Sequence, residues 1–140
     1  TAIRDQMLVS TRWITHFALF ERELYHTEVS DSRRWYRGVR DIQYLNVPEE
    51  RLDQPDWAAK YHFAMAPVYY HNYLLGEMLA SQFDHALRAR SGGNVLTAEN
   101  GRWFVNSVFT PGAQYPWNSM IDLATGEPLN PAYLVQQFNY

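Results

Sequence analysis

Apolar residues recur at intervals of three, four and seven along most of this chain, which is the spacing of an amphipathic helix. Ile3, Met7, Ile14 and Phe17 set the pattern in the first segment. No segment sustains the alternation of apolar and polar residues that marks a half-buried strand. The sequence therefore predicts an all-α fold of about six helices, expected over residues 2–23, 31–45, 67–90, 97–108, 116–125 and 131–138.

Residues that start or stop helices stand at the predicted boundaries. Ser, Asp and Thr accept the free N–H groups of a first turn, Pro cannot continue a helix, and Gly readily adopts the left-handed conformation after a last turn. Residues 48–59 are expected to form a charged connection between the second and third helices. The boundary residues are Ser30, Asp31 and Thr97 as N-caps, Pro48 as a stop, Pro116 and Pro131 in first turns, and Gly92, Gly93 and Gly126 as C-terminal ends.

The composition limits the classes of protein to which the chain can belong. Its 140 residues fit one helical domain, 1–140. A net charge of −3 gives no basic surface for nucleic acid, and no apolar run approaches the ~20 residues that span a bilayer. Without cysteine there is no disulfide and no thiolate ligand. Because Thr1 stands in place of an initiator Met, the chain is expected to be a fragment of a larger protein.

Aromatic residues make up 16% of the chain and include five tryptophans. Trp13, Trp35 and Tyr36 stand at helical spacing and are expected in the core. The rest of this aromatic content indicates thick helix packing or a surface for a partner, so the isolated chain is expected to self-associate. Arg33 and Arg34 lie in a predicted first turn, where they oppose the helix dipole, and are expected to pair with a partner or a distant carboxylate.

A cation, an imidazole and three phenols stand close to the start of the third predicted helix: Lys60, His62, Tyr69, Tyr70 and Tyr73. Donors gathered at a helix start are suited to an anion or a developing oxyanion. This group is therefore the main candidate for chemistry, with Tyr70 and Tyr73 expected on one helical face. The alternative is that the tyrosines are ordinary interfacial aromatics and that the imidazole is solvated or satisfied in the core.

The histidines do not form a recognisable metal motif. None belongs to the H-E-x-x-H pattern of zinc peptidases, and no close pair has a ligating carboxylate beside it. A metal ion bound wholly by this chain is therefore not expected. The five histidines are His16, His26, His62, His71 and His85.

Short motifs follow one another in order along nearly the whole chain. They are Ala59-Lys60-Tyr61-His62, Val68-Tyr69-Tyr70-His71-Asn72-Tyr73, Gln82-Phe83, Ala86-Leu87, Phe109-Thr110-Pro111-Gly112, Pro116-Trp117, Met120 and Thr125-Gly126, together with Trp13, Trp35 and Pro48. Their order resembles the C-terminal part of the catalytic domain of angiotensin-converting-enzyme-like zinc peptidases, the peptidyl-dipeptidases. A more distant similarity runs to the thimet-oligopeptidase-like family.

The resemblance implies a role for each residue of the donor group. Lys60 resembles the lysine that meets the C-terminal carboxylate of the substrate, and Tyr70 the tyrosine that shares this carboxylate. His62 resembles the histidine that bonds the substrate backbone, and Tyr73 the phenol that stabilises the tetrahedral oxyanion. Because the spacing from His62 to Tyr70 is one residue longer than the family pattern, Tyr69 could take the role of Tyr70.

The resemblance also implies a fold and a function. The expected fold is a helical C-terminal subdomain of a zincin-type metallopeptidase. Its function would be the substrate-binding and oxyanion-stabilising half of a zinc-dependent peptidase. The zinc ion would be bound upstream, outside this chain, so the chain alone would neither bind catalytic zinc nor cleave peptides. The resemblance favours a periplasmic or extracellular location. The alternative is a non-catalytic helical module that binds peptides or acts as a scaffold.

Overall fold

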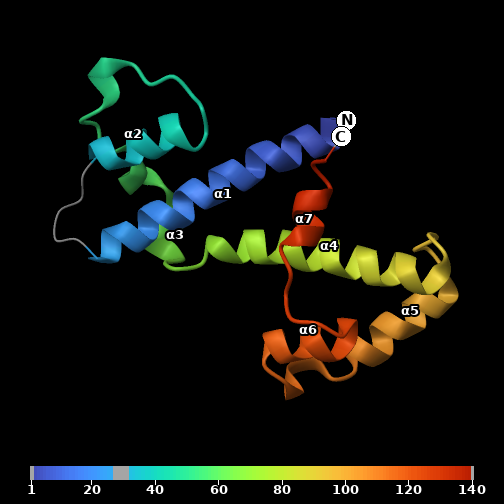
Figure 1. Cartoon of the computed structure of the whole chain (residues 1–140). Coiled ribbons are helices and arrows are strands. Elements are labelled where there is room, and N and C mark those ends of the chain that lie inside the picture. The colour runs from blue at the N-terminus through green and yellow to red at the C-terminus, as the bar shows by residue number, and fades with distance from the viewer. Residues whose placement is uncertain (1, 27–31, 140) are drawn as a thin grey trace. The chain divides into compact units, whose positions relative to one another are not determined.

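The computed structural model describes residues 2–26 and 32–139 (Figure 1). These residues contain seven α-helices, several short 3-10 or π-helical turns and no strand, which confirms the predicted all-α class. None of the described helices is long and apolar enough to cross a membrane.

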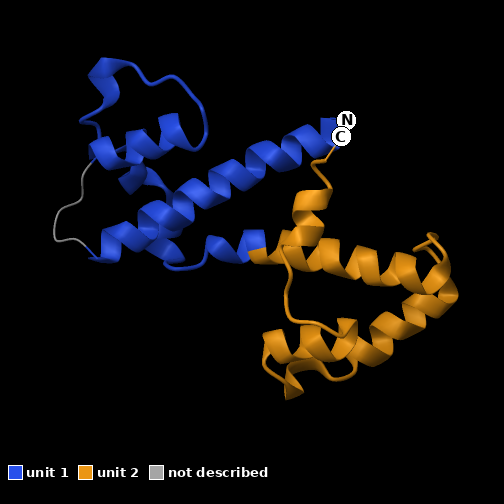
Figure 2. Cartoon of the chain, in the orientation of Figure 1, with its two compact units in different colours: residues 1–74 blue, residues 75–140 orange. Residues whose placement is uncertain are grey.

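The chain divides into two compact units, residues 1–74 and residues 75–140 (Figure 2). Helix α4 runs through the boundary between them. A single cooperative domain, as the length suggests, stays a prediction that unfolding experiments can test.

Unit 1 is built around the long helix α1, and a cluster of aromatic and aliphatic side chains fills its core. Phe17 and Phe20 of α1 pack against Trp35 and Tyr36, with Trp13 at the edge of the cluster. This confirms the predicted core positions of Trp35 and Tyr36, whereas Trp13 is only partly buried and packs against the core. The elements of the unit are α1 (Ala2–His26), α2 (Ser32–Asp41), η1 (Glu49–Arg51), η2 (Asp56–Ala59), α3 (Tyr61–Met65) and the start of α4 (His71–Ser91).

Helix α2 ends at Asp41, several residues before the predicted end at 45. At its end the carbonyl of Gly38 accepts the N–H groups of both Ile42 and Gln43, and the bond five residues apart widens the last turn. Tyr44 then takes a left-handed conformation, with φ of 56°, which no helix can continue. The N-cap predicted at residues 30–31 lies outside the described residues.

The third helix, α4, begins later in the chain than predicted. It begins at His71 and not at Pro67, because Val68 is left-handed with φ of 57°. Tyr70 therefore lies just before α4, and only Tyr73 of the two predicted neighbours is helical. The C-terminal end agrees with prediction, since Gly92 and Gly93 have positive φ.

Unit 2 contains the rest of α4, followed by α5 (Ala98–Phe104), the π-helical segment η3 (Val105–Phe109), η4 (Gly112–Gln114), α6 (Trp117–Thr125) and α7 (Ala132–Gln136). The predicted N-cap at Thr97 is confirmed, because its hydroxyl accepts the N–H of Asn100 at 3.1 Å. Gly126 ends α6 with φ of 85°, again as predicted.

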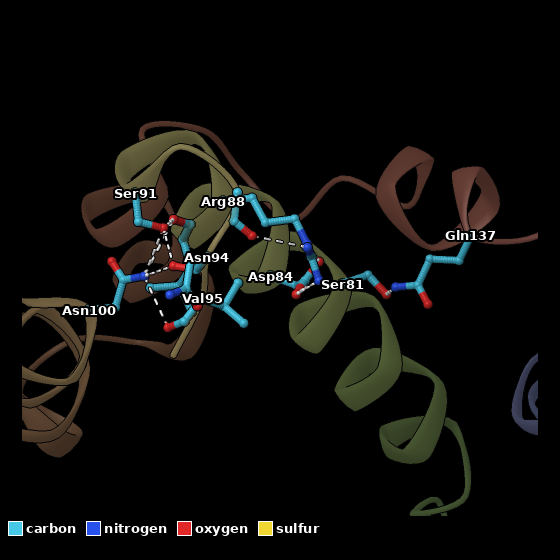
Figure 3. A network of polar contacts seen from close by, with 10 residues as sticks. Ser81, Asp84, Arg88, Ser91, Asn94, Val95, Asn100 and Gln137 are labelled. Carbon is cyan, nitrogen blue, oxygen red and sulfur yellow. Dashed lines mark hydrogen bonds and ion pairs between the residues drawn. The ribbon is translucent and has the colours of Figure 1, made fainter. Parts of the chain in front are cut away.

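Two buried amides tie the loops of unit 2 to its helices. The Asn100 amide nitrogen donates to Ser91 and to the carbonyls of Asn94 and Val95, as Figure 3 shows. The Gln82 amide binds residues 125–130 in the same way, through the Thr125 hydroxyl, two backbone carbonyls and one backbone N–H. Buried polar groups need such partners, so these amides fix the loop geometry.

The adjacent arginines of α2 reach carboxylates elsewhere in unit 1. Arg33 makes a two-pronged contact with Asp53, at 2.7 and 2.8 Å, and Arg34 lies 3.5 Å from Glu23. The predicted pairing with distant carboxylates is therefore confirmed.

Candidate substrate-binding site

All five predicted site residues lie in unit 1. They stand in α3, in the first turn of α4, or directly before one of these helices. Lys60 immediately precedes α3 and His62 belongs to it. Tyr69 and Tyr70 stand just before α4, and Tyr73 lies in its first turn. The break at Val68 therefore separates the cation and imidazole from the phenols in the chain, while the fold brings them back together.

His62, Tyr70 and Tyr73 form one connected group. The His62 Nε2 and the Tyr73 hydroxyl lie 3.3 Å apart, within hydrogen-bond distance. The ring centroid of Tyr70 lies 4.6 Å from that of His62 and 5.2 Å from that of Tyr73, both edge to face. Such a group can present a hydroxyl and an imidazole to one ligand.

Tyr70 is the most firmly held of the three tyrosines. Its ring stacks on Phe17 at a centroid distance of 4.1 Å and an interplanar angle of 19°. Its hydroxyl accepts the indole N–H of Trp13 at 2.5 Å. Burial raises the pKa of Tyr70, the Trp13 N–H opposes this, and Tyr73 adds a smaller upward contribution. The hydroxyl is therefore neutral at ordinary pH and free to donate its proton.

Lys60 lies over aromatic faces and not beside a carboxylate. Its Nζ is 5.7 Å from the ring centroid of Trp13 and 6.0 Å from that of Trp35. Among the described residues no carboxylate lies within ion-pair distance of it. Cation–π contacts restrain an ammonium without neutralising it, so Lys60 keeps its charge available for an anion.

Tyr69 is half exposed, at 49%, and contacts only the edge of this group. Its ring centroid lies 5.7 Å from that of Tyr73. In the part of the chain that the structure describes, its hydroxyl has no hydrogen-bond partner. The structure therefore holds the hydroxyl of Tyr70 in place and leaves that of Tyr69 more exposed.

A second polar group beside the site was not found in the sequence. Asp56 accepts hydrogen bonds from the Tyr36 hydroxyl and from Arg51. These bonds, with a smaller contribution from the charge of Lys60, hold the pKa of Asp56 below its usual value. Asp56 is thus bound by its own partners and makes no ion pair with Lys60.

The described residues do not fit a zinc ion. No three His, Asp or Glu side chains among residues 2–26 and 32–139 lie close enough to hold a metal. A hollow of about 410 Å³ borders the start of α4, where Glu21, His26, Val68 and His71 line it, but it contains none of the predicted site residues.

Comparisons of this chain with family models, with curated proteins and with solved structures find no match. The resemblance to zinc peptidases therefore stays a prediction from the motifs of this sequence.

Proposed function

We propose that unit 1 forms the carboxylate-binding and oxyanion-stabilising part of a zinc-dependent peptidase active site, of the peptidyl-dipeptidase or oligopeptidase type. The observation that carries this proposal is that Lys60 and Tyr70 both contact the indole of Trp13, while His62 and Tyr73 contact Tyr70. An ammonium with no ion pair to a carboxylate of the described residues, on the same indole as a hydroxyl whose proton is free, is suited to a peptide's C-terminal carboxylate.

Each side chain has a distinct task in this proposal. Lys60 supplies the charge that selects a free carboxylate, and Tyr70 donates a second hydrogen bond to it. His62 and Tyr73, 3.3 Å apart, lie further along the bound peptide. There the imidazole bonds the substrate backbone, and the phenol donates to the oxygen on which negative charge develops.

The metal belongs to residues outside this chain in the proposal. Zinc polarises a scissile carbonyl and activates water in peptidases of this kind. The part assigned to this chain is to bind and orient the substrate. If the longer protein has no H-E-x-x-H motif, the same geometry instead favours the alternative, a peptide-binding module without catalysis.

The binding part of the proposal can be tested on the chain itself. Two peptides of identical sequence, one ending in a carboxylate and one in a carboxamide, are titrated into the protein by calorimetry. We expect the carboxylate peptide to bind about tenfold more tightly or better, as hydrogen bonds to charged groups contribute roughly 1.5–3 kcal/mol. Lys60→Gln should remove the preference and Lys60→Arg should keep part of it. Equal binding of both peptides to the unaltered chain would refute the proposal.

Chemical labelling of Lys60 offers an independent check of carboxylate binding. Lys60 is the only lysine, so an amine-reactive reagent can label one side chain and the terminal amine. The carboxylate peptide should slow labelling of Lys60, and the carboxamide peptide should not.

The catalytic part requires the longer protein. An H-E-x-x-H motif encoded upstream of residue 1 would support it, and an intact gene without this motif would support the module. In an active form, Tyr73→Phe should lower kcat by about 10²–10³, the loss typical of one oxyanion donor. A loss below about threefold would remove Tyr73 from this role.

A further inference from the structure

We infer that Trp13 is the positioning residue of the carboxylate site, because one indole holds both the hydroxyl of Tyr70 and the ammonium of Lys60. The inference rests on the proposed function and adds a residue that the sequence pattern assigned to packing alone. Trp13 belongs to α1, whereas the two groups that it holds flank α3, 47 and 57 residues further along the chain.

The hydrogen bond from Trp13 determines the direction in which the Tyr70 hydroxyl can donate. A tyrosine hydroxyl has one proton and can also accept hydrogen bonds. The indole N–H is a donor only, so at 2.5 Å it must occupy the acceptor side of the hydroxyl. The proton of Tyr70 is then directed away from Trp13 and toward a bound anion. The stacked ring of Phe17 holds the phenol plane, so the oxygen cannot easily leave this position.

The face of the same indole restrains Lys60. A lysine side chain loses much rotational freedom when its ammonium is held, and this loss weakens binding if it occurs only when the ligand arrives. The contacts of Nζ with the rings of Trp13 and Trp35 hold the ammonium in place before binding. Trp13 therefore brings the charge and the hydroxyl of the site into one fixed arrangement.

Tyr69 shows what the site would lack without this contact. It has the same phenol as Tyr70, but Tyr73 is its one aromatic neighbour among the described residues, where its hydroxyl has no hydrogen-bond partner. The contact with Trp13 is the feature that separates the two candidate tyrosines, and it assigns the carboxylate to Tyr70.

The test uses the chain with Trp13→Phe, which keeps an aromatic ring and removes the N–H. Trp103→Phe is the matched control, because Trp103 belongs to unit 2 and packs on Phe83 of the same unit. Two quantities are measured in each variant: the ratio of affinities for the carboxylate and carboxamide peptides, and the pKa of Tyr70. The second is followed by NMR with isotope-labelled tyrosine, and Tyr70→Phe identifies the signal.

We expect Trp13→Phe to reduce the carboxylate preference by about three- to tenfold, the value of one lost hydrogen bond, with little change in carboxamide binding. The pKa of Tyr70 should rise, because the donor that lowers it is gone. A purely structural role would weaken both peptides alike and leave the preference unchanged.

If Trp13→Phe does not fold, benzothienylalanine incorporated at position 13 retains the shape of indole and lacks the N–H. An unchanged preference or an unchanged Tyr70 pKa in a folded variant would overturn the inference and leave the proposed function in place. Absence of any preference in the unaltered chain would overturn both, and this result is seen without any substitution.

Discussion

The carboxylate of Glu21 accepts the backbone N–H of Val68 at 2.6 Å, so α1 holds the segment that leads into α4. Glu21 is buried, at 5% exposure, and Val68 is left-handed. A β-branched residue in that conformation is strained by about 1–3 kcal/mol and persists only where its surroundings hold it. The contact therefore helps to fix the break that places Tyr70 before α4.

Removal of this carboxylate should destabilise unit 1. We expect Glu21→Ala to lower the free energy of unfolding by about 1.5–3 kcal/mol, the range for hydrogen bonds to charged groups. Glu21→Gln keeps an acceptor and should cost less. Urea denaturation followed by tryptophan fluorescence measures both. Glu50→Ala, an exposed change in the same unit, is the control. If Glu21→Ala were no more destabilising than this control, the contact would have no role in fixing the segment.

The close packing of α2 on α1 leads to a second prediction. A Cβ built on Gly38 would lie 2.2 Å from His16 Cδ2 and 2.4 Å from Nε2. Because His16 is buried beside Trp35, it cannot move aside easily. Gly38→Ala should therefore cost about 1–3 kcal/mol despite the better helix propensity of alanine.

Gly76 is the natural control for Gly38. It is also helical, but a Cβ there meets nothing within 4 Å. Gly76→Ala should stabilise α4 by about 0.5–1 kcal/mol. Thermal unfolding of the two variants should move in opposite directions. A stabilising Gly38→Ala would mean that the helices are less closely packed than the structure indicates.

Periodicity predicted the helices well where local sequence alone sets the conformation. Helix α1 follows its apolar spacing throughout, and Thr97, Gly92 and Gly126 act as the caps that their chemistry implies. The failures occur at Tyr44 and Val68, which are left-handed although neither is glycine. Contacts distant in the sequence hold such residues, as Glu21 shows, and spacing does not report such contacts.

The candidate site was predictable in its members but not in its arrangement. Lys60, His62 and Tyr73 are hydrogen-bond donors, and their closeness in the sequence indicates the segment as a candidate site. The spacing of Trp13 predicts a buried helix face, and the structure shows it partly buried against the edge of the core. The direction of its N–H depends on the fold around Tyr70, so its second contact could not be predicted from the sequence.

Gln82 is another residue whose contacts cannot be predicted from its spacing in the sequence. It gives a third prediction. It stands in the apolar stripe of α4 and is 1% exposed, but its amide binds the chain at 125–130. Gln82→Leu preserves the size and removes the amide from the part-buried carbonyl of Pro128 and N–H of Asn130. We expect a loss of at least about 2 kcal/mol in unit 2.

Hydrogen exchange measures this change locally, because the N–H of Asn130 loses its acceptor and should lose protection. The control is Gln136→Leu, an exposed position on α7, which should change stability by less than about 0.5 kcal/mol. Equal stability of the two variants would show that the amide of Gln82 is replaceable by apolar packing.

Burial of His16 predicts that unit 1 is sensitive to acid. The residue is 1% exposed, its Nδ1 lies 2.6 Å from the side-chain amide nitrogen of Gln43, and its Nε2 has no hydrogen-bond partner in the described part of the chain. Burial lowers the pKa of His16 from 6.5 to about 4, and a backbone contact with Trp35 opposes this only in part. The native state therefore holds this imidazole in its neutral form.

The direction of the pH effect follows from these two pKa values. Between pH 6.5 and 4 the unfolded chain binds a proton at His16 and the native chain does not. Stability is then greatest above pH 6.5 and falls as the pH is lowered toward 4, by up to about 3 kcal/mol at 1.36 kcal/mol per pKa unit. Denaturation at a series of pH values should show a shallower slope for His16→Gln than for the unaltered chain. The comparison cancels the carboxylates that titrate in both proteins. Identical slopes for His16→Gln and the unaltered chain would mean that His16 is hydrated in solution and takes up its proton in the native state.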